Sequence, residues 1–244
     1  MVDPRIPLIS ERLREIRRVI AVSSGKGGVG KSLVASVLAL TLAKKGYKVG
    51  FFDTDFTSPS SHIILGVSNI QPEEKNGIVP PTVHGLKYMS IIYYAGDRAS
   101  PLRGAEFSNA LIELLAVTVW GELDFLIIDM PPGISDATLD VLRLIKKAEF
   151  LVVTTSSRLA FETVRKFIDL LLELNVPVLG VIENMKMTNS DFIRKETEEK
   201  GIKFWGEIPF DKNLEESIGD VERLLNIEFG KALERMIAEK IDLN

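Results

Sequence analysis

Short apolar runs alternate with longer helical segments along most of the chain. Residues 19–23 form a run rich in β-branched side chains that stops at a cluster of glycines, which predicts a buried strand. Residues 31–45 predict a helix, and because apolar residues occupy nearly every face of it, we expect an inner helix packed against a sheet. A second strand at residues 48–53 completes a βαβ unit, whose crossover should be right-handed.

The rest of the chain repeats this alternation. An amphipathic helix is expected at residues 8–18, and residues 66–85, which lack a clear period, are expected to form a surface excursion. Further strands are predicted at residues 86–93, 125–129, 150–154, 178–182 and 203–208, and further helices at residues 106–119, 136–147, 159–174 and 191–200, before a closing helical region that ends at Ile241. The pattern predicts an α/β fold with a mostly parallel, twisted sheet and helices on both faces. Because no internal repeat or domain boundary is visible, we expect residues 1–244 to form a single domain that opens with a short helix.

The strongest chemical signal is the glycine-rich segment at residues 25–32, which matches the pattern G-x-x-x-x-G-K-[ST] between a predicted strand and a predicted helix. Glycines let successive backbone N–H groups turn toward a phosphate, and the N-terminus of the helix adds favourable partial charge. Lys31 would neutralise the terminal phosphates, and Ser32 offers a hydroxyl oxygen to Mg²⁺. We therefore predict a P-loop NTPase that binds ATP and Mg²⁺, with nucleotide contacts from Gly25, Lys26, Gly27, Gly28, Val29, Gly30, Lys31, Ser32 and Leu33.

Lys26 occupies a position that this general pattern leaves free. It lies at the mouth of the loop, where a second ammonium would stabilise charge that develops on the γ-phosphate, in its own subunit or across a dimer. The alternative is a solvated loop lysine with no catalytic role.

Acidic residues follow two of the predicted strands. The predicted strand at residues 48–53 ends in Asp53, and Asp55 follows two residues later. The apolar strand at residues 125–129 ends in Asp129. Because the carboxyl ends of parallel strands face the crevice where such sheets bind ligands, these carboxylates should lie beside the phosphate loop. Asp129 would face the water shell of the metal ion. Without a phosphate loop nearby, Asp53 and Asp55 would be more typical of a solvated turn.

The segment at residues 25–32 resembles the deviant Walker A motif of the ParA/MinD/Mrp group of P-loop ATPases. In that group the extra lysine reaches the nucleotide of the partner subunit, which implies the same role for Lys26. Three further segments resemble the Mrp/ApbC branch of the group: a D-x-P-P-G switch II that begins at Asp129, an E-N-M segment that begins at Glu183, and an I-P-F-D segment that begins at Ile208.

This resemblance implies roles for further residues. Asp55 matches the aspartate that positions the attacking water, which makes Lys26, Lys31 and Asp55 the candidate catalytic residues. Asp53 matches the aspartate near Mg²⁺, so that the candidate metal residues are Ser32, Asp53 and Asp129.

The nucleotide base has its own candidates. Asn184 matches the asparagine that reads the adenine edge, a role that suits a carboxamide because it can pair with the N6/N7 edge of adenine. Pro209 and Phe210 lie in the loop that would close over the base.

Composition changes this picture in one important respect, because the chain contains no cysteine. That excludes a disulfide framework, a thiolate zinc site and an iron–sulfur cluster held by this chain's own thiolates. Mrp/ApbC proteins carry C-x-x-C shortly after E-N-M, whereas this chain continues from Lys186 without it, so no iron–sulfur cluster is expected. Ser156 and Ser157 stand in place of the branch's T-P-Q stretch, with an effect that the sequence leaves open.

Charge and hydropathy limit location and partners. The formal net charge of −4 makes nucleic acid an improbable partner. No secretory signal or transmembrane segment is recognised, so we expect a cytoplasmic protein.

We expect a Mg²⁺-dependent, ATP-hydrolysing molecular switch that forms an ATP-dependent homodimer and acts on an unknown protein partner. One alternative is a binding module that holds ATP between two subunits with negligible turnover. Another is a positioning ATPase like MinD or ParA, although the balanced charges at residues 229–241 are less typical of a membrane-binding helix.

Overall fold

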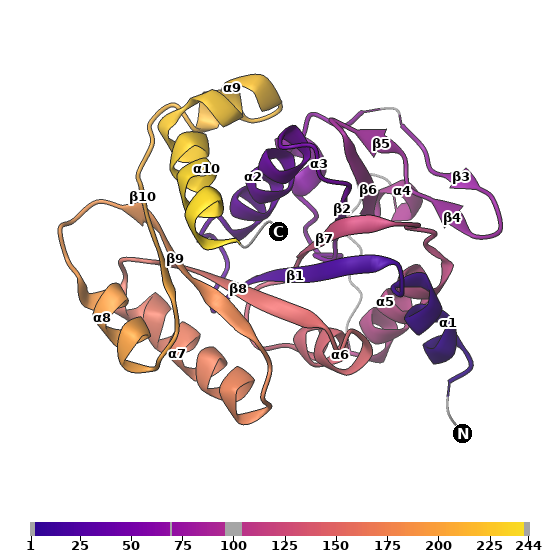
Figure 1. Ribbon diagram of the computed structural model, residues 1–244, viewed down its shortest axis with the longest axis horizontal. Coiled ribbons are helices and arrows are strands. Elements are labelled where there is room, and N and C mark those ends of the chain that lie inside the picture. Colours follow the sequence, from indigo (N-terminus) through magenta and orange to yellow (C-terminus); the bar gives the residue numbers. More distant parts are fainter. Residues whose placement is uncertain (1–2, 69, 96–103, 242–244) are drawn as a thin grey trace.

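The computed structural model describes residues 3–68, 70–95 and 104–241 of the chain. Within them, eight strands form one sheet in the order β10-β9-β8-β1-β7-β2-β6-β5 (Figure 1). The strands are β1 (Ile16–Ser24), β2 (Val49–Asp53), β5 (Thr82–Val83), β6 (Leu86–Ser90), β7 (Leu123–Asp129), β8 (Ala148–Thr155), β9 (Val178–Lys186) and β10 (Phe204–Pro209). Neighbouring strands are parallel except β5 and β6, so the predicted mostly parallel sheet is confirmed.

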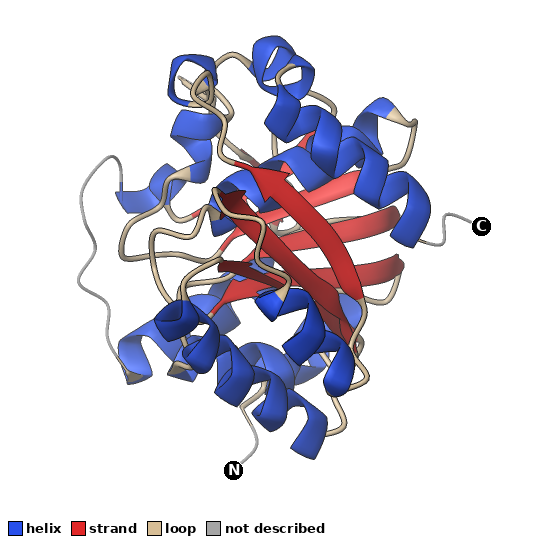
Figure 2. Ribbon diagram, turned by 90° about the vertical axis from the view of Figure 1, so that its left-hand side faces the viewer, coloured by secondary structure: helices blue, strands red, loops and turns tan. Residues whose placement is uncertain are grey.

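Helices cover both faces of the sheet, as predicted (Figure 2). One face carries α1 (Arg5–Arg12), α5 (Ala105–Val117), α6 (Asp136–Leu144), α7 (Arg158–Glu173) and α8 (Phe192–Glu199). The other face carries α2 (Lys31–Lys44), α3 (Ser61–Ile64), α9 (Val221–Asn226) and α10 (Glu228–Lys240). The apolar residues of α2 are buried along most of its length, which confirms an inner helix.

Two apolar cores result, one on each face of the sheet. Successive side chains of a strand point to opposite faces, and β1 shows this directly. Val19 belongs to the core beneath α5 and α7, whereas Ile20 belongs to the core beneath α2 and α10. The two tryptophans of the chain are divided in the same way, with Trp120 in the first core and Trp205 in the second.

The boundary between α1 and β1 differs from the prediction. The helix ends at Arg12, and residues 16–18, which were expected to be helical, begin β1 instead. Ile16 is buried and pairs with Leu123 of β7, and Arg18 forms an ion pair with Glu149 of β8 at 2.8 Å. These partners are far along the chain, so the local pattern could not show that the strand begins before the arginines.

Residues 66–85 contain more regular structure than expected. A hairpin of β3 (Glu73–Glu74) and β4 (Ile78–Val79) precedes β5, and Ile78 forms a β-bridge with Thr118 just after α5. The following strand ends at Ser90, opposite Asp53 of β2, and α4 (Ile92–Ala95) takes the place of its predicted end. Strand β6 therefore stops where its partner strand stops.

The C-terminal part also has different limits. Strand β9 continues to Lys186, so that residues 183–186 lie in a strand rather than after one. The closing region contains a 3₁₀ turn, η1 (Glu215–Ser217), before α9 and α10. Among the described helices, none is long and apolar enough to cross a membrane.

Candidate functional site

The phosphate loop connects β1 to α2, as the sequence predicts. Gly28 and Gly30 adopt positive φ angles of 77° and 79°, which favour glycine. Gly25 is required for a different reason: a Cβ there would lie 2.8 Å from the backbone nitrogen of Val164 in α7. The loop is thus shaped both by its own turn and by the close approach of a helix.

Lys31 and Asp129 form an ion pair beneath this loop. The distance between Lys31 Nζ and Asp129 Oδ1 is 2.5 Å, and their side chains are 7% and 0% exposed. Lys31 Nζ also lies 3.2 Å from the hydroxyl of Ser32, and this hydroxyl faces Asp129. The three residues therefore form one polar group at the start of α2, in which Lys31 and Asp129 are buried.

Asp53 lies next to Asp129 because β2 and β7 are parallel neighbours that place the two residues in register. Both carboxylates are fully buried. Asp53 accepts hydrogen bonds from the Asp55 amide at 3.0 Å and from the Ser61 hydroxyl, and Tyr88 lies 2.8 Å from the same hydroxyl. Burial, and then the charge of Asp129, raise the pKa of Asp53 to about 7.

Two hollows meet at the phosphate loop. The first, of about 330 Å³, is lined by residues of the loop together with Leu33, Asp55, Ser60, Ile64, Pro132 and Ile218. The second, of about 650 Å³, lies between Asp55, the loop after β7 and the first turns of α5. Lys26 is exposed and lines the first hollow, whereas Asp55 lines both. Asp55 therefore occupies the boundary between the two hollows.

The predicted base-binding residues lie apart from these hollows. Asn184 is 1% exposed in β9, and its carboxamide donates a hydrogen bond to the carbonyl of Val29 at 2.9 Å. A Cβ on Gly30 would lie 2.3 Å from the Asn184 nitrogen, so this side chain directly supports the phosphate loop. Pro209 and Phe210 are exposed at the end of β10. Contact of these three residues with adenine stays a prediction.

Polar residues that the sequence left unexplained hold the end of β9. Ser156 lies 2.8 Å from a carboxylate oxygen of the buried Glu183, and Ser157 caps α7 through the Ala160 amide. Lys186 forms ion pairs with Glu183 at 2.8 Å and with Glu207 at 3.3 Å. Lys186 also donates a hydrogen bond to the carbonyl of Ser190. This contact fixes the segment after β9, which is the segment that carries C-x-x-C in Mrp/ApbC proteins.

The oxygen donors at the loop are suitable for Mg²⁺. Asp129 Oδ2 is buried without a hydrogen-bond partner among the described residues, which leaves an acceptor oxygen beside the Ser32 hydroxyl. Mg²⁺ is usually bound by one or two carboxylates together with substrate phosphates and water. Both oxygens of Asp53 already accept hydrogen bonds, so Asp53 is better placed to support this group than to ligate the ion. Within the described ranges, no group of three or more His, Cys, Asp or Glu side chains is arranged so that it could hold a metal ion without other ligands.

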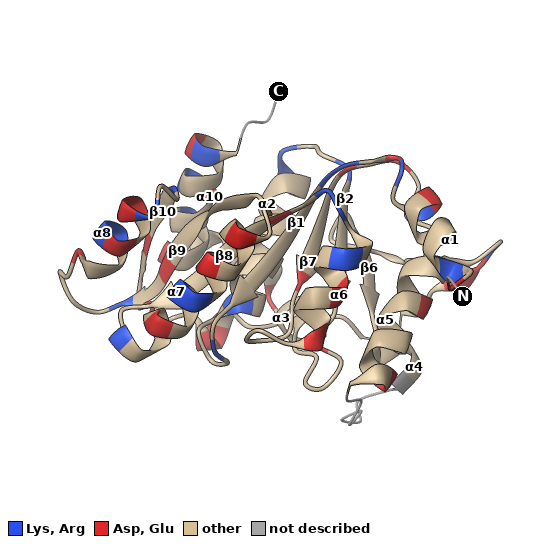
Figure 3. Cartoon of the chain, turned by 90° about the horizontal axis from the view of Figure 1, so that it is seen from below, with Lys and Arg blue, Asp and Glu red and all other residues tan. Residues whose placement is uncertain are grey.

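Charged residues of both signs are mixed on the side of the fold that carries α7 and α8. Figure 3 shows lysine and arginine interspersed with acidic residues over α7 and α8. On α7, for example, Arg165 forms an ion pair with Glu162, and Asp169 pairs with Lys200, the residue directly after α8. This mixture offers no continuous track for a phosphate backbone on that side.

Known proteins resemble this chain over most of its length. A ParA family model, described as NUBPL iron-transfer P-loop NTPase, matches residues 15–241. An iron-sulfur cluster carrier protein from Pseudomonas fragi is 40% identical over 177 residues, which are 71% of this chain and 62% of that protein. A protein of the same name from Methanocaldococcus jannaschii is 37% identical over 261 residues, covering 96% of this chain and 88% of that protein.

A solved structure provides the corresponding comparison of folds. The nucleotide-binding protein from Archaeoglobus fulgidus in complex with ADP is 31% identical, with a TM-score of 0.78 and coverage of 98% of both chains. The chain spans less than two thirds of the length of several of the curated relatives that it matches.

Proposed function

The chain belongs to the ParA/NUBPL family of P-loop NTPases, and we propose that it is a Mg²⁺-dependent ATPase whose dimerisation is coupled to nucleotide. One observation carries the proposal: the phosphate loop, Lys31 and Asp55 line one hollow of about 330 Å³, and the buried Asp129 pairs with Lys31 next to it. Such a hollow, in the size range of small-molecule sites, combines cation, carboxylate and backbone N–H groups.

Each residue of this site has a separate role in phosphoryl transfer. The loop amides and Lys31 bind and neutralise the phosphates, because they form a concave group of donors at the N-terminus of α2. Ser32 and Asp129 would hold Mg²⁺, which supplies charge neutralisation at the transferred phosphoryl group. Asp55, at the boundary of the two hollows, orients the attacking water, and the Asp55 amide is in turn fixed by Asp53.

The function that we propose for this chain differs from the one that the name of its relatives implies. The two relatives described above are named iron-sulfur cluster carrier proteins, but this chain has no cysteine with which to bind a cluster. The segment after β9 is instead tied down by Lys186. We propose that the protein keeps the nucleotide cycle and acts by contact with a partner protein in the cytoplasm.

A membrane-positioning role is disfavoured by the packing of α10. Its apolar residues Phe229, Leu233 and Ile237 are buried in the core against the sheet. Of its exposed cations, Arg235 pairs with Glu228 of the same helix. A helix that binds a membrane surface needs a free apolar face, and the apolar face of α10 is already covered by the sheet.

Single-turnover hydrolysis of γ-labelled ATP tests the proposal and separates it from the ATP-locked binding module. We expect phosphate release with Mg²⁺ and none when EDTA removes the metal. Sedimentation velocity on the same samples should show a dimer with ATP and a monomer without nucleotide. Tight ATP binding without phosphate release over many hours would favour the binding module, and absence of ATP binding would refute both.

A further inference from the structure

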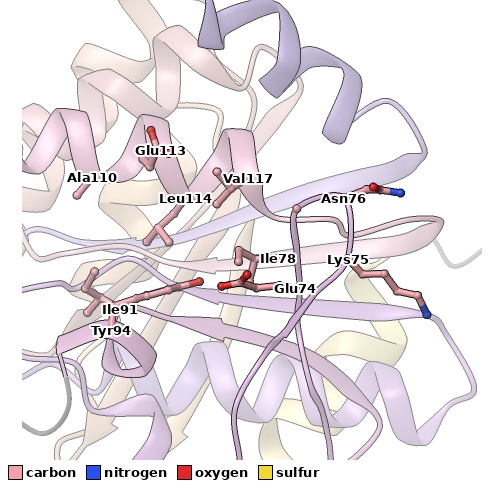
Figure 4. Close-up of a pocket in the computed structure, with 11 residues that line it drawn as sticks. Glu74, Lys75, Asn76, Ile78, Ile91, Tyr94, Ala110, Glu113, Leu114 and Val117 are labelled. Carbon is pink, nitrogen blue, oxygen red and sulfur yellow. The ribbon is translucent and has the colours of Figure 1, made fainter.

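An open cavity of about 670 Å³ lies outside the nucleotide site. Its walls are the second half of α5, the hairpin of β3 and β4, and the segment around α4 (Figure 4). The apolar lining residues are Ile78, Ile91, Ala110, Leu114 and Val117. A volume of this size accommodates a small organic ligand or a few side chains of a peptide.

The hairpin that forms one wall is fastened in place. Arg12 of α1 donates hydrogen bonds to the carbonyl of Asn76 at 2.8 Å and to that of Ala116 at 3.2 Å. The amide of Val119 donates to the carbonyl of Ile78 at 2.8 Å. These hydrogen bonds hold the hairpin against α1 and against the segment after α5. The cavity lies between the hairpin and α5.

The carboxylate of Glu74 and the hydroxyl of Tyr94 are the polar groups that matter at this cavity. Figure 4 shows the side chains of Lys75 and Asn76 directed away from the cavity, whereas the hydroxyl of Tyr94 points toward the carboxylate of Glu74. Glu74 forms no ion pair with any residue in the described ranges, and Glu113 at the rim pairs only with Arg5, at 3.1 Å. Burial and the neighbouring Glu74 raise the pKa of Tyr94, which keeps its hydroxyl protonated.

We propose that this cavity binds an apolar chain that ends in a primary ammonium group, with the chain against Leu114 and Val117 and the ammonium at Glu74. The apolar walls favour burial of methylene groups, and the carboxylate selects the sign of the charge. A carboxylate-ended chain of the same length would place like charges together and bind less well. A free amphiphilic amine and a lysine side chain of another protein present the same chemistry.

Helix α5 connects this cavity to the nucleotide site. Gly104 and Phe107 at its beginning line the second hollow, and Phe107 stacks on Phe56, the residue after Asp55, with ring centroids 4.8 Å apart. Ala110 and Leu114, one and two turns later, line the cavity. A ligand in the cavity would thus contact a helix that also borders the hollow lined by Asp55.

Chemical-shift titration of methyl-labelled protein with octylammonium and with octanoate tests the proposal. We expect octylammonium to shift the methyl resonances of Ile78, Leu114 and Val117 and to bind at least tenfold more tightly than octanoate. Glu74→Gln should remove the preference, while Glu73→Gln, the neighbouring exposed residue that does not line the cavity, should retain it. Ala110→Trp should fill the cavity and abolish binding of both probes.

Unchanged ATP affinity in Glu74→Gln and Ala110→Trp will show that these variants are folded, because neither residue belongs to the nucleotide site. A capped leucyl-leucyl-lysine peptide distinguishes the two sources. Tighter binding of the peptide than of octylammonium assigns the site to a protein segment, and the reverse assigns it to a free amine. Equal affinity for octylammonium and octanoate, or shifts confined to residues outside the cavity, would overturn the proposal.

Discussion

Lys31 Nζ lies 2.5 Å from Asp129 Oδ1, and this contact joins the residue that should neutralise phosphate to the residue that should face the metal ion. Both side chains are almost completely buried. A charge in such a position must be compensated, and here each residue compensates the other. Phosphate groups that enter the loop would therefore compete with Asp129 for the Lys31 ammonium, and a metal ion held by Asp129 would supply the positive charge that this carboxylate loses.

Lys31→Ala should abolish ATP binding. A buried, charge-assisted contact with phosphate contributes on the order of 2–5 kcal/mol, and the variant also leaves Asp129 without its counter-ion. Calorimetric titration with ATP measures the loss. Lys45→Ala, an exposed lysine at the end of the same helix, is the control and should bind like the wild type. ATP affinity within twofold of wild type in Lys31→Ala would contradict the assignment of the loop.

Asp55→Ala should separate binding from turnover. A carboxylate that orients water acts mainly in the transition state, so ATP binding should persist while turnover falls about 10²-fold or more. Asp55→Asn is the sharper variant, because its carbonyl can still accept the hydrogen bond that the Ser58 amide now donates at 3.2 Å. Phosphate release measured under single-turnover conditions distinguishes the outcomes, and normal release in both variants would exclude Asp55 from the chemistry.

Lys26→Gln should weaken ATP-dependent dimerisation. Lys26 is exposed at the mouth of the first hollow, where its ammonium can offset repulsion between two triphosphates that face each other in a dimer. Sedimentation should show less dimer with ATP, and turnover should fall, while affinity of the monomer for ADP stays near wild type. Lys26→Arg keeps the charge and should retain the dimer. The same oligomer with and without ATP in all three proteins would defeat this prediction.

Asp53 should make the stability of the metal-free protein depend on pH. Its pKa is about 7 in the fold, whereas an aspartate in an unfolded chain titrates near 3.9, so the native state binds the extra proton between these values. The contribution of Asp53 to the free energy of unfolding should consequently fall as pH rises from about 4 to 7, by at most about 1.4 kcal/mol per pH unit. Urea unfolding at several pH values measures this slope. Asp53→Asn should flatten it, and an exposed control, Asp191→Asn, should not.

Reconstitution with iron and sulfide should leave no stoichiometric cluster on the desalted protein. A [4Fe–4S] cluster ordinarily takes four thiolate ligands, and the chain supplies none. The two histidines per chain and the available carboxylates are poorer ligands for such a cluster. Iron and sulfide analysis, with visible absorption, provides the measurement. A stable cluster on the isolated chain would contradict this expectation, because side chains without sulfur would then have to hold the iron.

The sequence was most informative where one short segment determines both structure and chemistry. The spacing of glycines before Lys31 predicts the loop between β1 and α2, and the acids at the ends of apolar strands predict carboxylates beside that loop, where the structure places Asp53 next to Asp129. These inferences succeed because parallel strands place their carboxyl ends at one edge. A residue at the carboxyl end of one of these strands therefore lies near the phosphate loop.

Contacts between segments that lie far apart in the sequence could not be predicted from such motifs. Ile218 lines the first hollow from the region before α9, and Ser61 reaches Asp53 from α3, but neither belongs to a recognisable motif. The carboxamide of Asn184 was predicted to read a base, and its hydrogen bond with the Val29 carbonyl depends on how β9 passes beneath the loop. Only the packing of the whole sheet determines such contacts.

The division of the apolar interior into two cores also places one native fluorophore on each side of the sheet. Trp120 is fully buried, with its ring nitrogen unpaired among the described residues, whereas Trp205 donates to the Leu179 carbonyl at 2.9 Å. Their different surroundings should give them different emission maxima. Replacing either tryptophan by phenylalanine would leave a protein whose fluorescence reports on one layer alone, so that the two sides of the sheet can be observed separately as the molecule unfolds.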